Sequence, residues 1–163
     1  MAVGKRAHIG ATSREFCPCH HTQWSAVRTL SAVHYLSDEW FAAADNAVRA
    51  AADSAPKTNV VVHQVMTNGR SYRIRVGRGQ CSIEPMTDDD SLEQADASFT
   101  QSLETATAVA TGRTDAHQAF LLGRIRFEGE AHVLIDQREA FEWLEAVLAP
   151  VMATTTFADQ TSD

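Results

Sequence analysis

Residues 119–130 read AFLLGRIRFEGE, and they contain the end of one predicted element and the whole of the next. The apolar start closes a helix predicted over residues 115–122, which ends at Gly123. In residues 124–128, arginines alternate with isoleucine and phenylalanine, the period-two pattern of a strand with one apolar face. A helix and a strand that each have one apolar side bury those sides against a shared core.

The chain upstream of this stretch predicts four more strands. Residues 59–67 are rich in β-branched side chains, and the Asn-Gly pair at 68–69 is the strongest short signal for a type I′ hairpin turn. Residues 71–76 again alternate apolar side chains with arginines, and a third strand continues through residues 81–83. A fourth strand is predicted over residues 97–101, after a polar, acidic loop.

Hydroxyl side chains mark the predicted helix starts. Ser37 caps an amphipathic helix that stops before Pro56, because the residue before a proline resists helical geometry. Ser102 caps a helix predicted over residues 103–111, and Thr114 caps the helix that follows it.

Residues 131–152 form the last predicted helical region, in which Asp136 and Glu139 have the capping-box spacing that restarts a helix. The element order is therefore α-β-β-β-β-α-α-β-α. Strands and helices with one apolar face each, in this order, predict an α+β fold with helices laid over a single sheet.

The size of the chain fits one compact domain, because it has 163 residues of which 44% are hydrophobic. We predict a poorly ordered leader over residues 1–33, a folded domain over residues 34–156 and a short tail over residues 157–163. No window approaches 18 uncharged apolar residues, and the start of the chain lacks the apolar stretch of a secretory signal. A cytoplasmic location is therefore expected.

Charge and cysteine content exclude several classes. With 21 acidic residues against 14 lysines and arginines, the net charge of −7 argues against general nucleic-acid binding. Three cysteines do not suggest a disulfide framework. Residues 17–21 (CPCHH) hold soft-metal ligands without the spacing of a structural zinc site, so we expect adventitious affinity only. Residues 88–90 (DDD) lack calcium-loop spacing and are expected to be solvated.

The sequence contains no nucleophile elbow, phosphate-binding loop, zinc-protease motif or dinucleotide fingerprint. Cys81 or a serine would form a nucleophile–base pair with His63, His117 or His132 only in a fold that brought them together. We expect His63 to be a half-buried strand residue and the other two histidines to be exposed helix residues. No catalytic residue, cofactor or metal site is therefore predicted.

The arginines of two predicted strands form a candidate surface. Arg73, Arg75, Arg124 and Arg126 all project from the face opposite the core if their strands share one sheet. A solvated face that keeps the sheet soluble is the preferred interpretation. The alternative is a basic patch for an anionic headgroup, a nucleotide phosphate or a membrane surface.

The apolar residues of the second half of the chain have two interpretations. They close a dry core, or they line a ligand cavity, and such cavities of ~300–1,000 Å³ are also predominantly apolar. Periodicity does not separate the two, and on pattern alone the packed core is favoured.

Three stretches together resemble a known family. Residues 97–101 (ASFTQ), the helix after them that ends in glycine, and residues 119–130 are similar to the sterol carrier protein type-2 lipid-transfer domain. Residues 36–41 (LSDEWF) and 136–155 resemble its stand-alone actinobacterial-type members. The resemblance covers residues 34–156 and keeps the order of every predicted element.

This resemblance implies a five-stranded, mostly antiparallel sheet with helices on one face and an apolar cavity between them. One departure is Gly129-Glu130, where the family has Gly-Asp, and we expect it only to adjust the turn. The helix after Asp136 is expected to act as a lid. The residues expected to line the cavity and bind ligand are Phe99, Leu103, Val109, Phe120, Ile125, Phe127, Leu134, Phe141, Leu144 and Leu148.

The function that the resemblance implies is non-catalytic binding and transfer of a fatty acid, a fatty acyl-coenzyme A or a sterol-like lipid. The expected partner is that lipid or acyl chain. Transient contact with a membrane surface is compatible with this function, and no nucleic-acid partner is expected. Two alternatives stay open. One is a small isomerase or hydrolase that uses Glu84 or Glu128, and the other is a module that binds an acidic partner through the arginine face.

Overall fold

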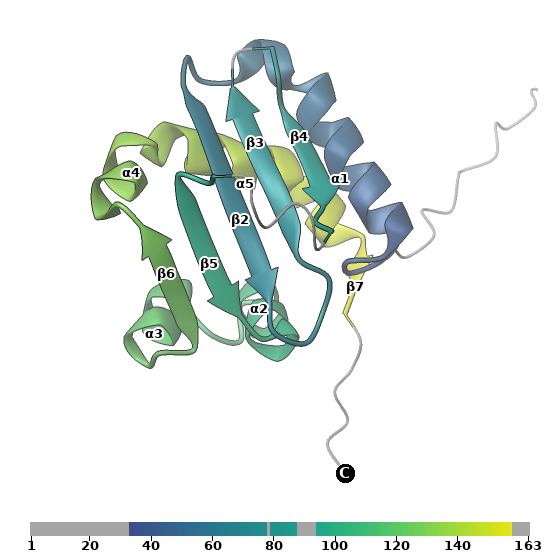
Figure 1. The fold of residues 1–163 in the computed structure, drawn as a ribbon. Helices are drawn as coiled ribbons and strands as arrows, with labels where there is room; N and C mark the ends of the chain where they lie inside the picture. The colour runs from purple at the N-terminus through teal and green to yellow at the C-terminus, as the bar shows by residue number, and fades with distance from the viewer. Residues whose placement is uncertain (1–32, 78, 88–93, 158–163) are drawn as a thin grey trace, which may run out of the picture.

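The computed structural model describes residues 33–77, 79–87 and 94–157, and it confirms an α+β fold with helices on one face of a five-stranded sheet (Figure 1). The strand order across the sheet is β4-β3-β2-β5-β6. The strands are β2 (Asn59–Met66), β3 (Tyr72–Gly77), β4 (Ser82–Pro85), β5 (Ala97–Gln101) and β6 (Ile125–Gly129).

The sheet is mixed because of one parallel pair. Strands β2, β3 and β4 form an antiparallel meander, and β6 is antiparallel to β5. The chain leaves β4 at one edge and enters β5 on the far side of β2, so β5 runs parallel to β2. The expectation of a mostly antiparallel sheet is therefore confirmed.

The helices differ greatly in length, and this difference shapes the interior. The 13-residue α1 packs on β4 and on the 16-residue α5, whereas α3 and α4 have six residues each. The helices are α1 (Asp38–Ala50), α2 (Leu103–Ala110), α3 (Ala116–Leu121), α4 (Ala131–Asp136) and α5 (Arg138–Ala153), and a short 3-10 turn, η1 (Ala52–Ser54), follows α1.

A small second sheet was not predicted. Strand β1 (Val33–His34) pairs in parallel with β7 (Thr155–Thr156), which joins the two ends of the described chain. The ring of Tyr35 lies 5.2 Å from that of Phe157 and extends this contact. Two residues carry no usable periodicity, so local sequence has no signal for a pair this short.

Two of the predicted helix caps are confirmed. The Ser37 hydroxyl accepts a hydrogen bond from the backbone N–H of Trp40 at 3.2 Å, and Ser102 accepts one from Thr105 at 3.1 Å. Each bond satisfies a backbone donor that the first turn of a helix leaves free.

The other two caps were wrong. Asp115, and not Thr114, caps α3, because its carboxylate accepts from the backbone N–H of Gln118 at 3.1 Å. The proposed capping box at Asp136 does not form, because Asp136 is still the last residue of α4. Gln137 alone separates α4 from α5 and caps α5 without a side-chain hydrogen bond.

The connection at 68–69 is also wider than the predicted type I′ turn. Neither Asn68 nor Gly69 has a positive φ, and the connection takes residues 67–71. The physical reason is that Asn68 has another partner: its side-chain oxygen accepts from the backbone N–H of Leu103, at the start of α2, at 2.7 Å. The turn therefore anchors a helix instead of closing a tight hairpin.

The main core lies between α1 and the meander. Trp40 and Val48 of α1 belong to one buried apolar cluster with Val62 of β2 and Ile74 of β3. The rings of Trp40 and Tyr72 pack edge to face with centroids 5.7 Å apart. These residues form the main buried cluster of the domain.

The outer face of the sheet is not the solvated arginine face that we expected. Arg73 is only 8% exposed, and its guanidinium pairs with Glu84 at 3.1 Å. His63, which is paired with Arg73 across β2 and β3, is 6% exposed and therefore fully buried, not half-buried. Arg124 and Arg126 are exposed at the opposite edge, so the four arginines do not form one patch.

Candidate functional site

The inner face of β5 and β6 borders a hollow, here called the first cavity, with a volume of about 630 Å³. It lies between these strands and helices α2 to α5. Its lining is almost entirely apolar. The lining residues are Gln64, Phe99, Gln101, Val109, Ala116, His117, Phe120, Ile125, Phe127, Ala131, Leu134 and Phe141.

A second cavity of about 650 Å³ adjoins the first. Gln64, Val109 and Phe141 line both, so the two cavities are adjacent at β2, α2 and α5. The remaining lining residues of the second cavity are Tyr35, Trp40, Tyr72, Ile74, Ala110, Leu144, Glu145, Leu148, Ala149, Met152 and Ala153.

The hollow follows from the unequal lengths of the covering helices. Under α1, the inward residue Ile83 of β4 is 1% exposed. Phe99 and Phe127 occupy the equivalent inward positions of β5 and β6, directly opposite each other with ring centroids 5.4 Å apart, yet they are only half-buried. Helices of six residues span about 9 Å and cannot cover this part of the sheet as α1 covers the rest.

The structure places most of the expected binding residues around these two cavities. Leu103 is the exception, since it lines neither cavity and packs beside Gly69, with its backbone held by Asn68. Leu144 and Leu148 border the second cavity. The first cavity is bordered by Phe99, Val109, Phe120, Ile125, Phe127, Leu134 and Phe141.

Several lining residues were missed by the sequence reasoning. Gln64 and Gln101 occupy inward strand positions, where Gln101 donates to the Gln64 side-chain oxygen at 3.3 Å. The period-two pattern carries this signal, because Gln64 is two residues from the buried Val62 and Met66. Tyr35 had no such signal.

Two of the polar groups that line the second cavity are the phenols of Tyr35 and Tyr72. The Tyr72 hydroxyl donates a hydrogen bond to that of Tyr35. Burial raises the pKa of Tyr72 well above 10.0, and burial also raises the pKa of Tyr35 despite the hydrogen bond that it accepts from Tyr72. Both side chains are therefore uncharged at neutral pH, and among the lining residues only the exposed Glu145 is a carboxylate.

Candidates for bond chemistry lie elsewhere. Glu84 and Glu128 are on the outer face of the sheet and border neither cavity. His117 and His132 are exposed, as expected, and only His117 reaches a cavity. Within the described ranges, no group of three or more His, Cys, Asp or Glu side chains is placed to hold a metal ion. The stretches 17–21 and 88–90 lie outside the described residues.

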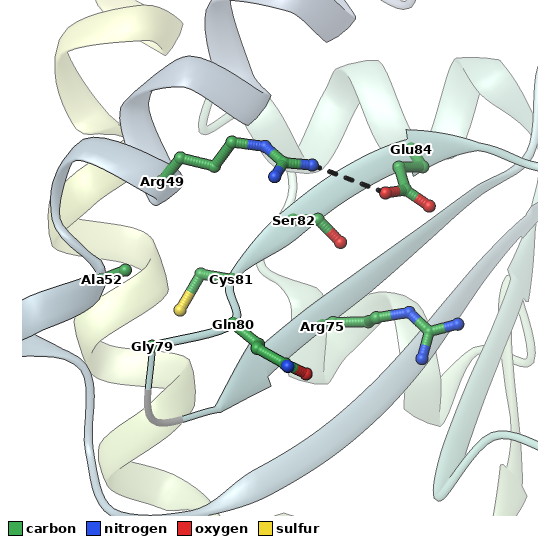
Figure 2. A pocket seen from close by; sticks show the side chains of 8 residues that line it. All are labelled: Arg49, Ala52, Arg75, Gly79, Gln80, Cys81, Ser82 and Glu84. Atoms are coloured by element: carbon green, nitrogen blue, oxygen red, sulfur yellow. Dashed lines mark ion pairs between the residues drawn. The ribbon is translucent and has the colours of Figure 1, made fainter.

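A separate polar hollow of about 480 Å³ lies at the edge strand β4 (Figure 2). Arg49 extends over it from α1 towards Glu84, at 3.6 Å, and also pairs with Asp45 at 2.6 Å. The Cys81 thiol is buried and donates to the backbone oxygen of Gly77 at 3.4 Å. Arg49 and Cys81 are thus held by contacts within the protein, and we assign no ligand to this hollow.

Comparison with known proteins identifies the fold family. A model of the SCP-2 sterol transfer family matches residues 40–142. The chain belongs to this family. The resemblance inferred from residues 97–101 and 119–130 is thereby confirmed, while the actinobacterial subtype stays a prediction. A search of curated protein sequences finds no match.

Solved structures of SCP-2 proteins share the fold at low identity. A possible sterol carrier protein from Thermus thermophilus, TT1886, is 16% identical, with a TM-score of 0.52 over 77% of this chain and 93% of that chain. A crystal structure of sterol carrier protein 2 is also 16% identical, with a TM-score of 0.50 over 68% of this chain and 94% of that one. A sec-alkyl sulfatase, PisA1, matches at 15% identity with a TM-score of 0.43; the match covers 52% of this chain and 13% of the sulfatase.

Proposed function

We propose that this protein binds one hydrophobic ligand at a time in the two adjoining cavities and transfers it without making or breaking bonds. The ligand class is a fatty acid, a fatty acyl-coenzyme A or a sterol-like lipid. The observation that carries the proposal is the pair of cavities of about 630 and 650 Å³, whose shared wall is Gln64, Val109 and Phe141. Membership of the SCP-2 sterol transfer family supports lipid binding in general.

The driving force is burial of hydrocarbon. Each methylene moved from water into an apolar cavity contributes ~0.8 kcal/mol, so a long chain binds well without a polar lock. The corollary is weak selectivity, because one methylene more or less changes binding only ~10–200-fold even in tuned pockets. The Tyr35–Tyr72 pair and the Gln64–Gln101 pair are neutral, and the one carboxylate among the lining residues, Glu145, is exposed.

The two alternative functions have less support. An isomerase or hydrolase needs an acid or base beside its substrate, and neither Glu84 nor Glu128 borders a cavity. A module that binds an acidic partner through the arginine face needs those arginines together, and Arg73 is buried against Glu84.

The test is titration of a fluorescent long-chain fatty acid into the protein and the variant Phe127→Asp. Phe127 borders the first cavity, so a carboxylate there places charge in the path of the alkyl chain. Thr100→Asp is the matched control, because Thr100 lies on the neighbouring strand with its side chain on the outer face. We expect Phe127→Asp to weaken binding at least ~10-fold, the effect of losing about two methylenes of burial, and the control to leave it unchanged.

Circular dichroism checks that both variants are folded. If folded Phe127→Asp binds the probe as tightly as the parent, the first cavity does not hold the ligand. If the parent does not bind any fatty acid, acyl-coenzyme A or sterol probe, the proposed function is wrong.

A further inference from the structure

The exposed apolar side chains of this protein are concentrated beside the first cavity. In the described part of the chain, the exposed large hydrophobic residues are Phe120, Leu121, Leu122 and Ile135, at 48%, 70%, 60% and 75%. The first three belong to α3 and the residue that ends it, and the fourth belongs to α4. Both helices also line the first cavity, and in Figure 1 they lie at opposite ends of the edge strand β6.

The charge of the surrounding residues differs between α3 and α4. Residues 111–126, which contain α3, carry three arginines and one aspartate, a net charge of +2 in a chain of −7. The aspartate is Asp115, and its carboxylate is engaged in capping α3. Ile135 instead stands among acidic side chains, next to Asp136 and after Glu130.

The arginines around α3 are available to a partner. Arg113, Arg124 and Arg126 are exposed, and none of them has an ion pair with a described residue. Adjacent exposed leucines with basic residues on either side are the features of a segment that enters the interface of an anionic membrane. Each arginine near such a surface adds attraction that falls with salt.

We propose that α3 and its flanks form a docking surface for an anionic lipid bilayer, which places the first cavity against the source of its ligand. This surface, the α3 patch, consists of Leu121, Leu122, Arg113 and Arg124, whereas Arg126 follows on β6 with its side chain on the outer face of the sheet. The inference rests on the proposed function. Phe120 connects the two parts, because it is both exposed beside Leu121 and part of the cavity lining. A lipid that leaves the bilayer at the α3 patch therefore meets apolar side chains on its way into the cavity.

A second copy of this chain is the competing occupant of the same leucines. It would cover Phe120 and His117, which border the first cavity from α3. A bilayer leaves that route in contact with lipid, and for this reason we favour the bilayer.

The experiment measures co-flotation of the full chain with vesicles of phosphatidylcholine, alone or with a minority of phosphatidylglycerol. We expect binding only to the anionic vesicles, and less of it as salt is added. Leu121→Gln should weaken partitioning by roughly tenfold, the effect of withdrawing one leucine from the interface. Ile135→Gln is the matched control, since it removes an equally exposed aliphatic side chain from acidic surroundings, and it should change partitioning by less than about twofold.

The outcomes separate this inference from the proposed function. Fatty-acid titration without vesicles tests the cavity alone and should be the same for parent, Leu121→Gln and Ile135→Gln; failure there affects the proposed function and not vesicle binding. The inference is overturned if the parent does not bind anionic vesicles, or if Leu121→Gln binds them as well as the parent. It is also overturned if the control loses as much binding as Leu121→Gln. Sedimentation showing a dimer that Leu121→Gln dissociates, with vesicle binding unchanged, would assign the patch to a second copy instead.

Discussion

Replacing Val109 with tryptophan should separate the two cavities. Val109 lies on α2 and lines both of them together with Gln64 and Phe141. Each cavity alone, at about 630 and 650 Å³, falls within the ~300–1,000 Å³ of ordinary ligand pockets. A short acyl chain therefore still fits in one cavity of the variant, whereas we expect an extended long chain to pass through the junction into the other.

The size of the effect follows from the length of the ligand. In the parent, each added methylene contributes ~0.8 kcal/mol, about fourfold in affinity, for as long as it enters apolar space. Between about eight and sixteen carbons, that gain is at most ~6 kcal/mol. If Val109→Trp confines the chain to one cavity and excludes half of the added methylenes, ~3 kcal/mol is lost, on the order of a hundredfold.

The assay is competitive displacement of a fluorescent probe by saturated fatty acids of increasing length. Parent and variant should have similar affinities for the short acids and diverge for the long ones. Val109→Leu is the control, because it enlarges the same side chain without closing the junction. If the affinity of Val109→Trp keeps rising with chain length at the rate of the parent, the two cavities do not act as one site.

Two further predictions concern stability. Gly129→Ala should lower the free energy of unfolding, measured by urea denaturation, by ~1–3 kcal/mol, because Gly129 has a φ of 130° and an added Cβ would lie 2.6 Å from the Asp96 backbone oxygen. Gly69→Ala is the control, because the nearest atoms to its added Cβ would be 3.5 Å away. An equal loss of stability in both variants would contradict the reasoning. Thermal stability should be fully present below pH 10 and fall above it, because burial raises the pKa of Tyr72 well above 10.0 and the unfolded chain therefore loses that proton first. Tyr72→Phe should flatten this alkaline loss, and an unchanged slope would show that other groups cause it.

The parts of the fold that local sequence predicts are those with a repeated local signal. Alternation placed Ile74 and Phe127 on the inner face, and hydroxyl caps located the starts of α1 and α2. Errors occurred where a distant partner decided the outcome. Asn68 bonds to the start of α2, across 35 positions of sequence, and this contact replaces the tight turn.

The sequence pattern did not predict whether the interior is hollow, for a different reason. The inward pattern of β5 and β6 is the same for a filled interior and a hollow one, and only the lengths of α3 and α4 separate the two outcomes. Those lengths depend on caps at Asp115 and Gln137 that sequence reasoning assigned to other residues. The ion pair of Arg73 was likewise not predicted, because its partner Glu84 lies on a neighbouring strand.

The pairing of β1 with β7 has a consequence for how the domain is attached to other parts of a chain. Because Val33 and Thr155 are neighbours in this pair, a module fused before the first strand and one fused after the last would be tethered at almost the same point. That point adjoins the second cavity, which Tyr35, Met152 and Ala153 border. A ligand exchanged through the second cavity would have to pass the point where such a module is attached. Exchange through the first cavity, beside the α3 patch, would not be obstructed.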